Sequence, residues 1–126
     1  MKTIWAGRIL TALSALFLLF DAAGHWFVPA AVVEAFHRLG YPLSLSRALA
    51  VIEIVCLVVY VIPRTAVLGA ILLTGYLGGA VATHLRVHDP LFDTLFPIIF
   101  GVLVWAGLYF RDHRLRALIP LTEPRP

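Results

Sequence analysis

The residue with the clearest potential for chemistry in this sequence is Glu53, an acidic side chain near the middle of a long apolar run. Placing a carboxylate at the centre of a membrane-spanning helix costs at least about 2.5–3.5 kcal/mol. Such residues therefore face a bundle interior, pair with a partner and mark a path for protons, ligands or electrons. Glu53 is thus a candidate proton acceptor and ligand-binding residue, or alternatively a polar group that bonds to a neighbouring helix.

A second pair of polar residues lies earlier in the chain, at Asp21 and His25. Their i, i+4 spacing places both side chains on one face of a helix, one turn apart. Asp21 is the other candidate proton acceptor, and His25 can donate a hydrogen bond to a bound ligand. The remaining candidate ligand-binding residues lie in the second half of the chain, at Tyr76, His84 and Asp93.

His84 and His88 have the spacing of two metal ligands on one helix face. Two histidines do not complete a ligand set, and Pro90 interrupts the helix soon afterwards, so we predict no metal site. Asp89 directly precedes Pro90, and aspartate followed by proline is typical of an N-cap and the first helical position. We therefore expect Asp89 to cap the next helix rather than to act as an acid.

The elements that must position these residues are membrane helices. The 126-residue chain is 61% hydrophobic and 13% charged, whereas soluble domains are about 45–50% apolar and about 25% charged. A spanning helix needs about 20 mostly apolar residues, and four segments qualify, at 4–27, 45–62, 65–85 and 91–110. The sequence thus predicts an all-α membrane protein, a four-helix bundle formed by one domain over residues 1–126.

The segment 29–40, between the first two spans, is too short and too polar to cross a membrane. Its apolar residues recur at helical spacing, and Gly40 stands where a helix C-terminus favours glycine. We predict a short amphipathic helix at the membrane interface, which either covers the bundle or only tethers the two spans.

The basic residues predict the orientation of the four spans. One side of the membrane holds seven of the ten, and the other side holds Arg38, Arg47 and Arg86. Because cytoplasmic loops carry the excess of lysine and arginine, both termini are expected in the cytoplasm, with residues 111–126 as a basic cytoplasmic tail. The same distribution, at helix ends rather than in one stripe, argues against nucleic acid as the partner that the net charge of +3 could otherwise suggest.

Small residues gather in the third span, where Gly75 and Gly79 form a GxxxG pair. Small residues allow the backbones of two membrane helices to approach closely. We predict that this pair packs against another helix of the same bundle, or alternatively that it forms a dimer contact. Either way, a bulky residue here is expected to destabilise the protein.

The motif Gly-Tyr-Leu-Gly-Gly-Ala-x-x-Thr-His at 75–84, followed by Asp89-Pro90, resembles the DoxX-like family of small four-helix membrane proteins. The resemblance extends to Asp-x-x-x-His at 21–25 and to Arg-x-Leu-Ala-x-x-Glu at 47–53, and it covers essentially the whole chain. It implies a bundle in the cytoplasmic, or inner, membrane of a bacterium. Some relatives belong to redox-linked membrane complexes, and the family's name comes from a subunit associated with thiosulfate:quinone oxidoreduction.

Three functions remain open at this point. The first is a redox-associated subunit that binds quinone or a small hydrophobic ligand around Glu53, in the half of the bundle away from the termini. The second is a non-catalytic protein that binds a lipid, another ligand or a partner subunit, as a homodimer or in an assembly. The third is a small proton-coupled permease. The single cysteine, Cys56, excludes an internal disulfide and a cysteine-ligated iron–sulfur cluster within one chain. The cofactor is left open, and quinone is the possibility that the resemblance implies.

Overall fold

Four long helices make up most of the molecule. The structure is a computed structural model that describes residues 1–122 and 124. The long helices are α1 (Lys2–Phe27), α3 (Ser46–Val61), α4 (Ala66–Arg86) and α5 (Leu91–Arg111). Their bounds lie within a few residues of the four predicted segments, because each apolar run ends at proline, glycine or charged residues. The predicted all-helical bundle is confirmed.

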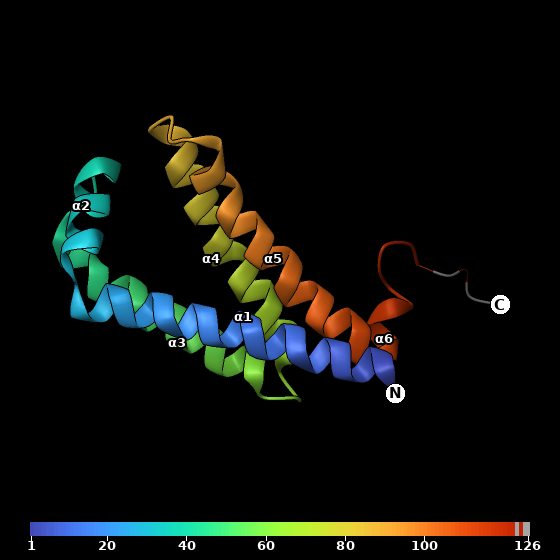
Figure 1. Cartoon of the computed structure of the whole chain (residues 1–126). Coiled ribbons are helices and arrows are strands. Elements are labelled where there is room, and N and C mark those ends of the chain that lie inside the picture. The colour runs from blue at the N-terminus through green and yellow to red at the C-terminus, as the bar shows by residue number, and fades with distance from the viewer. Residues whose placement is uncertain (123, 125–126) are drawn as a thin grey trace.

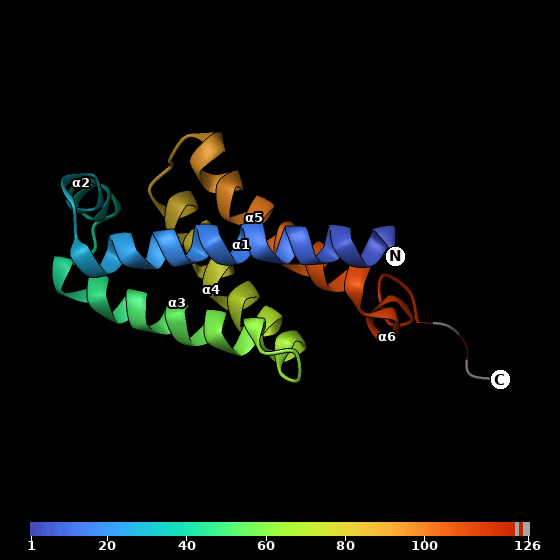
Figure 2. The ribbon, with the colours of Figure 1, turned by 60° about the horizontal axis from the view of Figure 1, so that its bottom comes forward.

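The four helices form a ring in which each one packs against two others. Helix α1 packs on α3 and α5, and α4 packs on the same two helices from the other side. Figures 1 and 2 show that the α4–α5 pair crosses the α1–α3 pair obliquely. The two pairs lie together near the termini and separate toward the end where α2 lies, which we call the α2 end.

All four long helices are apolar and long enough to cross a membrane. Large hydrophobic side chains cover their outward faces, among them Leu16 on α1, Val55 on α3 and Val102 on α5, each more than half exposed. In water such a surface would drive aggregation, whereas in lipid it contacts apolar chains at no penalty. The chain is therefore a multi-pass membrane protein.

The predicted amphipathic helix is present as α2 (Ala30–Leu39). It buries Phe36 and Leu39 against the bundle and leaves its charged face exposed. Gly40 ends the helix with a φ of 75°, a left-handed conformation that glycine adopts without strain. A short 3₁₀ helix, η1 (Leu43–Leu45), leads from there into α3.

The basic tail begins with more structure than expected. Arg111 is the last residue of α5, and a one-turn helix, α6 (His113–Arg116), follows it. Leu115 of α6 is buried and belongs to the apolar core, which anchors this turn to the bundle. The end of the predicted tail, including Glu123, Arg125 and Pro126, lies outside the described residues.

The glycines that bring helices together are Gly69, Gly7 and Gly107. A β-carbon on Gly69 would overlap the backbone of Tyr60, so α3 and α4 touch backbone to backbone. A β-carbon on Gly7 would lie 2.8 Å from the carbonyl oxygen of Gly107, which brings α1 against α5. All of these contacts lie in the part of the bundle nearer the termini, where the two helix pairs converge.

The prediction that Gly75 and Gly79 pack against another helix of the bundle is wrong. A β-carbon on either residue would meet no other heavy atom within 4 Å, and the same holds for Gly78. The physical reason is the crossing of the two helix pairs. Toward the α2 end α4 has left the α1–α3 pair, so its small residues face open space. The alternative of a dimer contact at these glycines stays a prediction.

Candidate functional site

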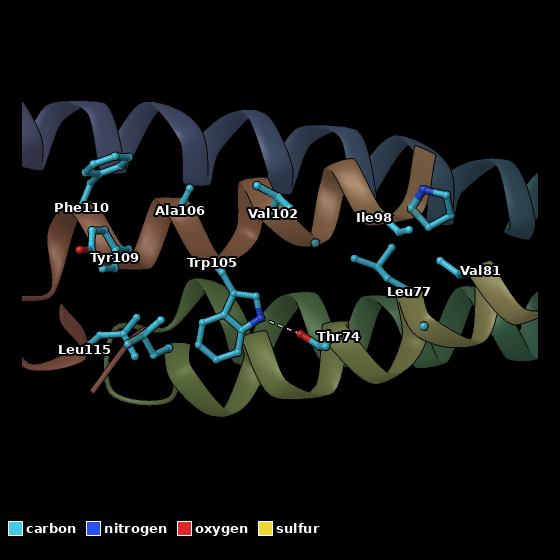
Figure 3. A pocket seen from close by; sticks show the side chains of 14 residues that line it. Thr74, Leu77, Val81, Ile98, Val102, Trp105, Ala106, Tyr109, Phe110 and Leu115 are labelled. Atoms are coloured by element: carbon cyan, nitrogen blue, oxygen red, sulfur yellow. Dashed lines mark hydrogen bonds between the residues drawn. The ribbon is translucent and has the colours of Figure 1, made fainter. Parts of the chain in front are cut away.

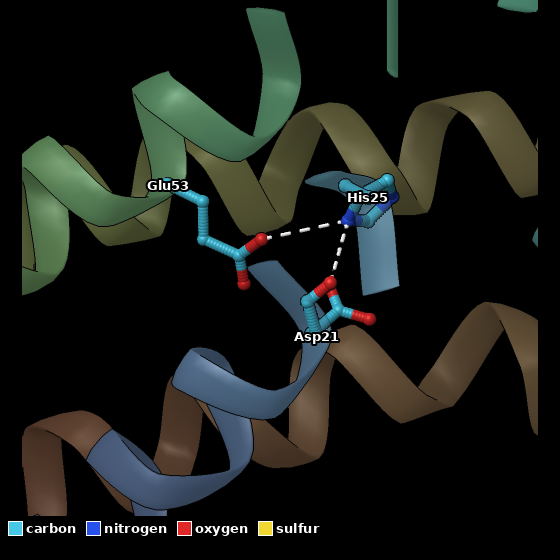
Figure 4. Close-up of side chains that lie close together, drawn as sticks. All are labelled: Asp21, His25 and Glu53. Carbon is cyan, nitrogen blue, oxygen red and sulfur yellow. Dashed lines mark hydrogen bonds and ion pairs between the residues drawn. The ribbon is translucent and has the colours of Figure 1, made fainter. Parts of the chain in front are cut away.

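Asp21, His25 and Glu53 meet between α1 and α3 at the α2 end. The Nδ1 atom of His25 lies 3.5 Å from a carboxylate oxygen of Asp21 and 3.7 Å from a carboxylate oxygen of Glu53 (Figure 4). Asp21 and His25 share a face of α1 as their spacing predicts. Glu53 lies on the buried face of α3 with Ala50, Leu57 and other core residues, which turns its carboxylate toward α1.

Glu53 is fully buried in the structure, and its two carboxylate oxygens differ in their surroundings. Oε2 accepts a hydrogen bond of 3.2 Å from the hydroxyl of Tyr76 on α4. Oε1 is also buried and has no hydrogen-bond partner among the described residues. A buried carboxylate oxygen without a partner is costly, so it calls for a bound proton, water or ligand.

These residues border a cleft of about 650 Å³ that α1, α2, α4 and α5 enclose at the α2 end. Five of the six predicted ligand-binding residues line it: Asp21, His25, Tyr76, His84 and Asp93. Glu53 does not line the cleft itself, but it contacts two residues that do, Tyr76 and His25. The structure therefore brings together residues from three helices that the sequence could only place on separate faces.

Part of the cleft lining is aromatic, which the sequence analysis missed. Phe92, Phe96 and Phe100 follow one another at four-residue intervals along α5, and all three line the cleft. The ring of Phe17 on α1 stacks on that of Phe100 with their centroids 3.8 Å apart. The four-residue repeat of phenylalanine was visible in the sequence and indicates one continuous aromatic face. The glycines Gly75 and Gly79 also border this cleft.

Asp89 does not cap α5, contrary to the sequence prediction. Helix α5 begins at Leu91 without a side-chain cap, and Pro90 lies just outside it. The carboxylate of Asp89 instead contacts Nδ1 of His84 at 2.6 Å and Nε of Arg38 at 3.1 Å. Tertiary partners from α2 and α4 thus outcompete the local cap, because charged partners bind a carboxylate more strongly than backbone N–H groups do.

The contacts of Asp89 with Arg38 and His84 hold α2 over the cleft, next to the loop that joins α4 and α5. Two further contacts support it. The hydroxyls of Tyr41 and Thr83 lie 2.8 Å apart, and the Arg86 guanidinium donates to the carbonyl of Leu39. His88 takes no part in it. Helix α4 ends at Arg86 and His88 has a φ of 56°, so the i, i+4 relation to His84 that a helical metal pair needs is lost.

The substitution Asp89→Asn is expected to loosen α2 at neutral pH. The hydrogen bond from His84, together with the nearby Arg38 guanidinium, holds the pKa of Asp89 below its ordinary value of 3.8. A lowered pKa stabilises the folded state above the ordinary value, and this stabilisation is lost only as the pH falls through the lower folded value. Amide hydrogen exchange of residues 30–41 at pH 7 measures the effect, since asparagine removes the charge that both partners contact.

Asp112→Asn is the matched control, because it alters an aspartate at the opposite end of the bundle. Protection of α2 should fall in Asp89→Asn and stay at the wild-type level in Asp112→Asn. If Asp89→Asn keeps wild-type protection at pH 7, the contact does not hold α2 in place.

A second cavity, of about 560 Å³, lies between α4 and α5 on the other side of the α4 glycines. Its lining residues are uncharged throughout, and the indole N–H of Trp105 donates a 2.7 Å hydrogen bond to the hydroxyl of Thr74 there (Figure 3). Such a surface suits lipid chains. It offers no carboxylate and no imidazole, so the cleft beside Glu53 is the candidate functional site.

Fold and site together define a class, namely a four-span membrane protein with an acid buried between helices and an adjoining aromatic cleft. A family model described as the DoxX-like family matches residues 9–107. The chain therefore belongs to the DoxX-like family, which confirms the resemblance found in the sequence. No curated protein and no solved structure matches the chain.

Proposed function

We propose that the protein binds a small hydrophobic molecule with a polar head, of the quinone type, in the cleft at the α2 end. The observation that carries this proposal is that a single cleft is lined by two chemically different sets of side chains. The polar set includes Asp21, His25 and Tyr76, and the aromatic set consists of phenylalanine rings. Pockets for ring-shaped ligands combine apolar and aromatic lining with a few convergent polar groups in this way.

The polar lining residues suit a ligand head group that both accepts and donates hydrogen bonds. His25 and His84 can donate to a carbonyl oxygen of the ligand, and the carboxylate of Asp21 can accept from a hydroxyl. Glu53 does not line the cleft, but it contacts Tyr76 and His25, which do. Its part in binding is to orient these two side chains and to take up a proton that passes through them.

The phenylalanine rings of the lining suit a planar ring in the ligand. Rings of phenylalanine prefer offset stacking or edge-to-face contact with another ring, and each such contact contributes about 0.5–1.5 kcal/mol beyond the buried area. Phe17 and Phe100 already stack on each other, and Phe96 meets both of them edge-on. A flat ligand ring can extend this stack at its free face.

We propose a redox-associated role on the same ground. A quinol that gives up two electrons also releases two protons, and carboxylates beside its head group are suitable acceptors. The electrons would pass to a partner subunit, because the one cysteine provides neither a dithiol pair nor a cluster within this chain. We further propose the inner membrane of a bacterium as the location, with both termini in the cytoplasm.

Transport finds less support than binding. A proton-coupled permease needs a polar path from Glu53 toward the end of the bundle that carries the termini. In the described part of the chain, two hydroxyls along that direction already donate to backbone carbonyls. Ser14 donates to the carbonyl of Leu10, and Tyr60 donates to that of Val104. Between them and Glu53 lie buried apolar side chains, including Leu18 and Leu57.

Glu53→Gln is expected to weaken the binding of a short-chain quinone by up to about tenfold and to flatten the pH dependence of binding. Glutamine keeps an acceptor for the Tyr76 hydroxyl, so the fold is retained, but it can neither carry charge nor accept a proton. A hydrogen bond to a charged group contributes about 1.5–3 kcal/mol, and because Glu53 acts on the ligand through Tyr76 and His25, only part of this energy is lost from binding. Equilibrium binding of decyl-ubiquinone to detergent-purified protein, in EDTA and across pH 5–8, provides the measurement.

Glu34→Gln is the matched control, since Glu34 lies exposed on α2 and outside the cleft lining. It should bind like the wild type at every pH. Lipid extraction from gently purified protein adds the identity of the native ligand. A wild-type protein that yields no quinone and binds none would refute the quinone assignment, and extraction of another apolar molecule lost in Glu53→Gln would assign the cleft to that molecule.

A further inference from the structure

The cluster of Asp21, His25 and Glu53 contains the donor types of a metal site. Each residue offers one ligand atom, an imidazole nitrogen or a carboxylate oxygen, and these atoms lie within 4.8 Å of one another. They come from two helices that pack together, so the cluster is held by the fold rather than by one flexible segment. Figure 4 shows the three side chains converging from α1 and α3.

The distances are close to those of ligands around one cation. Two ligands bound at about 2.0–2.2 Å in tetrahedral geometry lie roughly 3.3–3.6 Å apart. His25 Nδ1 lies 3.5 Å from the Asp21 oxygen and 3.7 Å from the Glu53 oxygen. To bind a cation, Nδ1 would exchange its 3.0 Å hydrogen bond with the Asp21 carbonyl for the metal. The ligand atoms of Asp21 and Glu53 lie within 4.8 Å of each other, so their side chains would rotate toward the cation on binding.

Two carboxyl groups lie beside one imidazole, the buried one of Glu53 and the half-exposed one of Asp21. Among the described residues His25 is the side chain that lies within ion-pair distance of both. One imidazolium neutralises at most one carboxylate, so the other needs a proton or a cation. A divalent cation would neutralise both carboxylates and leave His25 as a neutral ligand, which removes the penalty of an unpaired buried charge.

A second observation points independently to a ligand. Glu53 is 0% exposed, and its Oε1 has no hydrogen-bond partner among the described residues. The same carboxylate faces His25 through Oε2. The carboxylate of Glu53 therefore has one oxygen, Oε1, that is free to bind a cation, next to the oxygen that faces the cluster.

We propose that Asp21, His25 and Glu53 bind one divalent transition-metal cation. One imidazole and two carboxylates suit zinc, manganese or ferrous iron, rather than soft metals that prefer thiolates. Three protein ligands leave a coordination position open, as in catalytic rather than structural sites. Because Asp21 and His25 line the cleft, that position faces the space in which the hydrophobic ligand is proposed to bind.

Cobalt(II) is the probe, because its visible absorption reports both binding and geometry. The protein is purified without a histidine tag, freed of quinone by lipid exchange, stripped with EDTA, exchanged into chelator-free buffer and titrated with cobalt(II). We expect one cobalt per chain, with absorption intensified over that of the aqueous ion. Glu53→Gln and Asp21→Asn should each lower the cobalt affinity on the order of tenfold or more. Even the loss of a residue that only hydrogen-bonds to a metal ligand commonly reduces metal affinity by about 10–100-fold.

The controls are Glu34→Gln and His88→Ala, which remove a carboxylate and an imidazole outside the cluster and should bind cobalt like the wild type. Helicity and melting temperature identify a variant that fails to fold. Asp21 is half-exposed, with a side chain 42% accessible, so Asp21→Asn tests the site even if Glu53→Gln is unstable. Equal affinity of the wild type and Asp21→Asn, or a spectrum of aqueous cobalt, would mean an adventitious ion only and overturn the proposal.

The metal proposal and the quinone proposal fail separately. Cobalt is titrated without quinone, and quinone binding is measured in EDTA. A protein that binds quinone but no cobalt would refute the metal site alone, and a protein that binds cobalt but no quinone would refute the quinone assignment alone.

Discussion

Gly69→Ala is expected to destabilise the protein by about 1–3 kcal/mol or more, as overpacking in a close-packed interior does. The added methyl group would overlap the backbone N and Cα of Tyr60. Tyr60 lies in the last turn of α3 and Gly69 in the first turn of α4. Backbone atoms cannot rotate away as a side chain would, so the two helices must separate at the end where residues 62–65 join them. Tyr60 is fully buried and bonds to α5, which spreads the disturbance to a third helix. Thermal unfolding in a mild detergent measures the loss.

Gly75→Ala, six residues further along the same helix, is the matched control. Its methyl group would meet nothing within 4 Å, and alanine favours a helix over glycine by about 0.8–1.0 kcal/mol. The control should therefore melt at or above the wild-type temperature. Equal melting temperatures for the two variants would contradict the close contact between α3 and α4.

Gly75→Leu is expected to abolish ligand binding while leaving the melting temperature unchanged or raised. Gly75 lines the cleft and has open space at its α-carbon, so a leucine side chain would occupy volume meant for the ligand. A misfit of even one methylene in an apolar pocket changes affinity by about 10–200-fold, and leucine adds four carbons. Quinone binding and thermal unfolding of the same sample separate the two effects.

Gly78→Leu provides the comparison for this variant. Gly78 is equally open, but it lines the apolar cavity between α4 and α5 instead of the cleft. The same substitution there should leave quinone binding at the wild-type level. If both leucine variants lose binding to the same extent, the ligand does not occupy the cleft beside Glu53.

The helices were predictable because their signals are local. An apolar run of membrane length needs no knowledge of its neighbours, and proline at 63 and glycine at 40 mark ends that depend on a few adjacent residues. The helical faces of Asp21, His25 and Glu53 followed from spacing for the same reason. That these faces would meet depended only on α1 and α3 being neighbours.

The errors arose where distant parts of the chain decide the outcome. Gly75 and Gly79 have the spacing of a packing motif, but the oblique crossing of α4 over the α1–α3 pair leaves them open. Gly69, the residue in closest contact, belongs to no recognisable motif. Asp89 satisfies the local rule for an N-cap, yet Arg38, fifty-one residues away, competes for it. Helical periodicity gives the face of a helix but not the crossing angle that selects its partner.

Helix α2 is tied to the bundle at both of its ends. Only Val28 and Pro29 join it to α1, and the Asp89 contacts hold its C-terminal part to α4 and α5. The protein's own side chains thus hold α2 over the cleft. A preorganised site avoids the entropic penalty of ordering on binding. It also adapts poorly, so we expect the protein to discriminate sharply among ligands by ring size and substitution rather than to accept any apolar molecule.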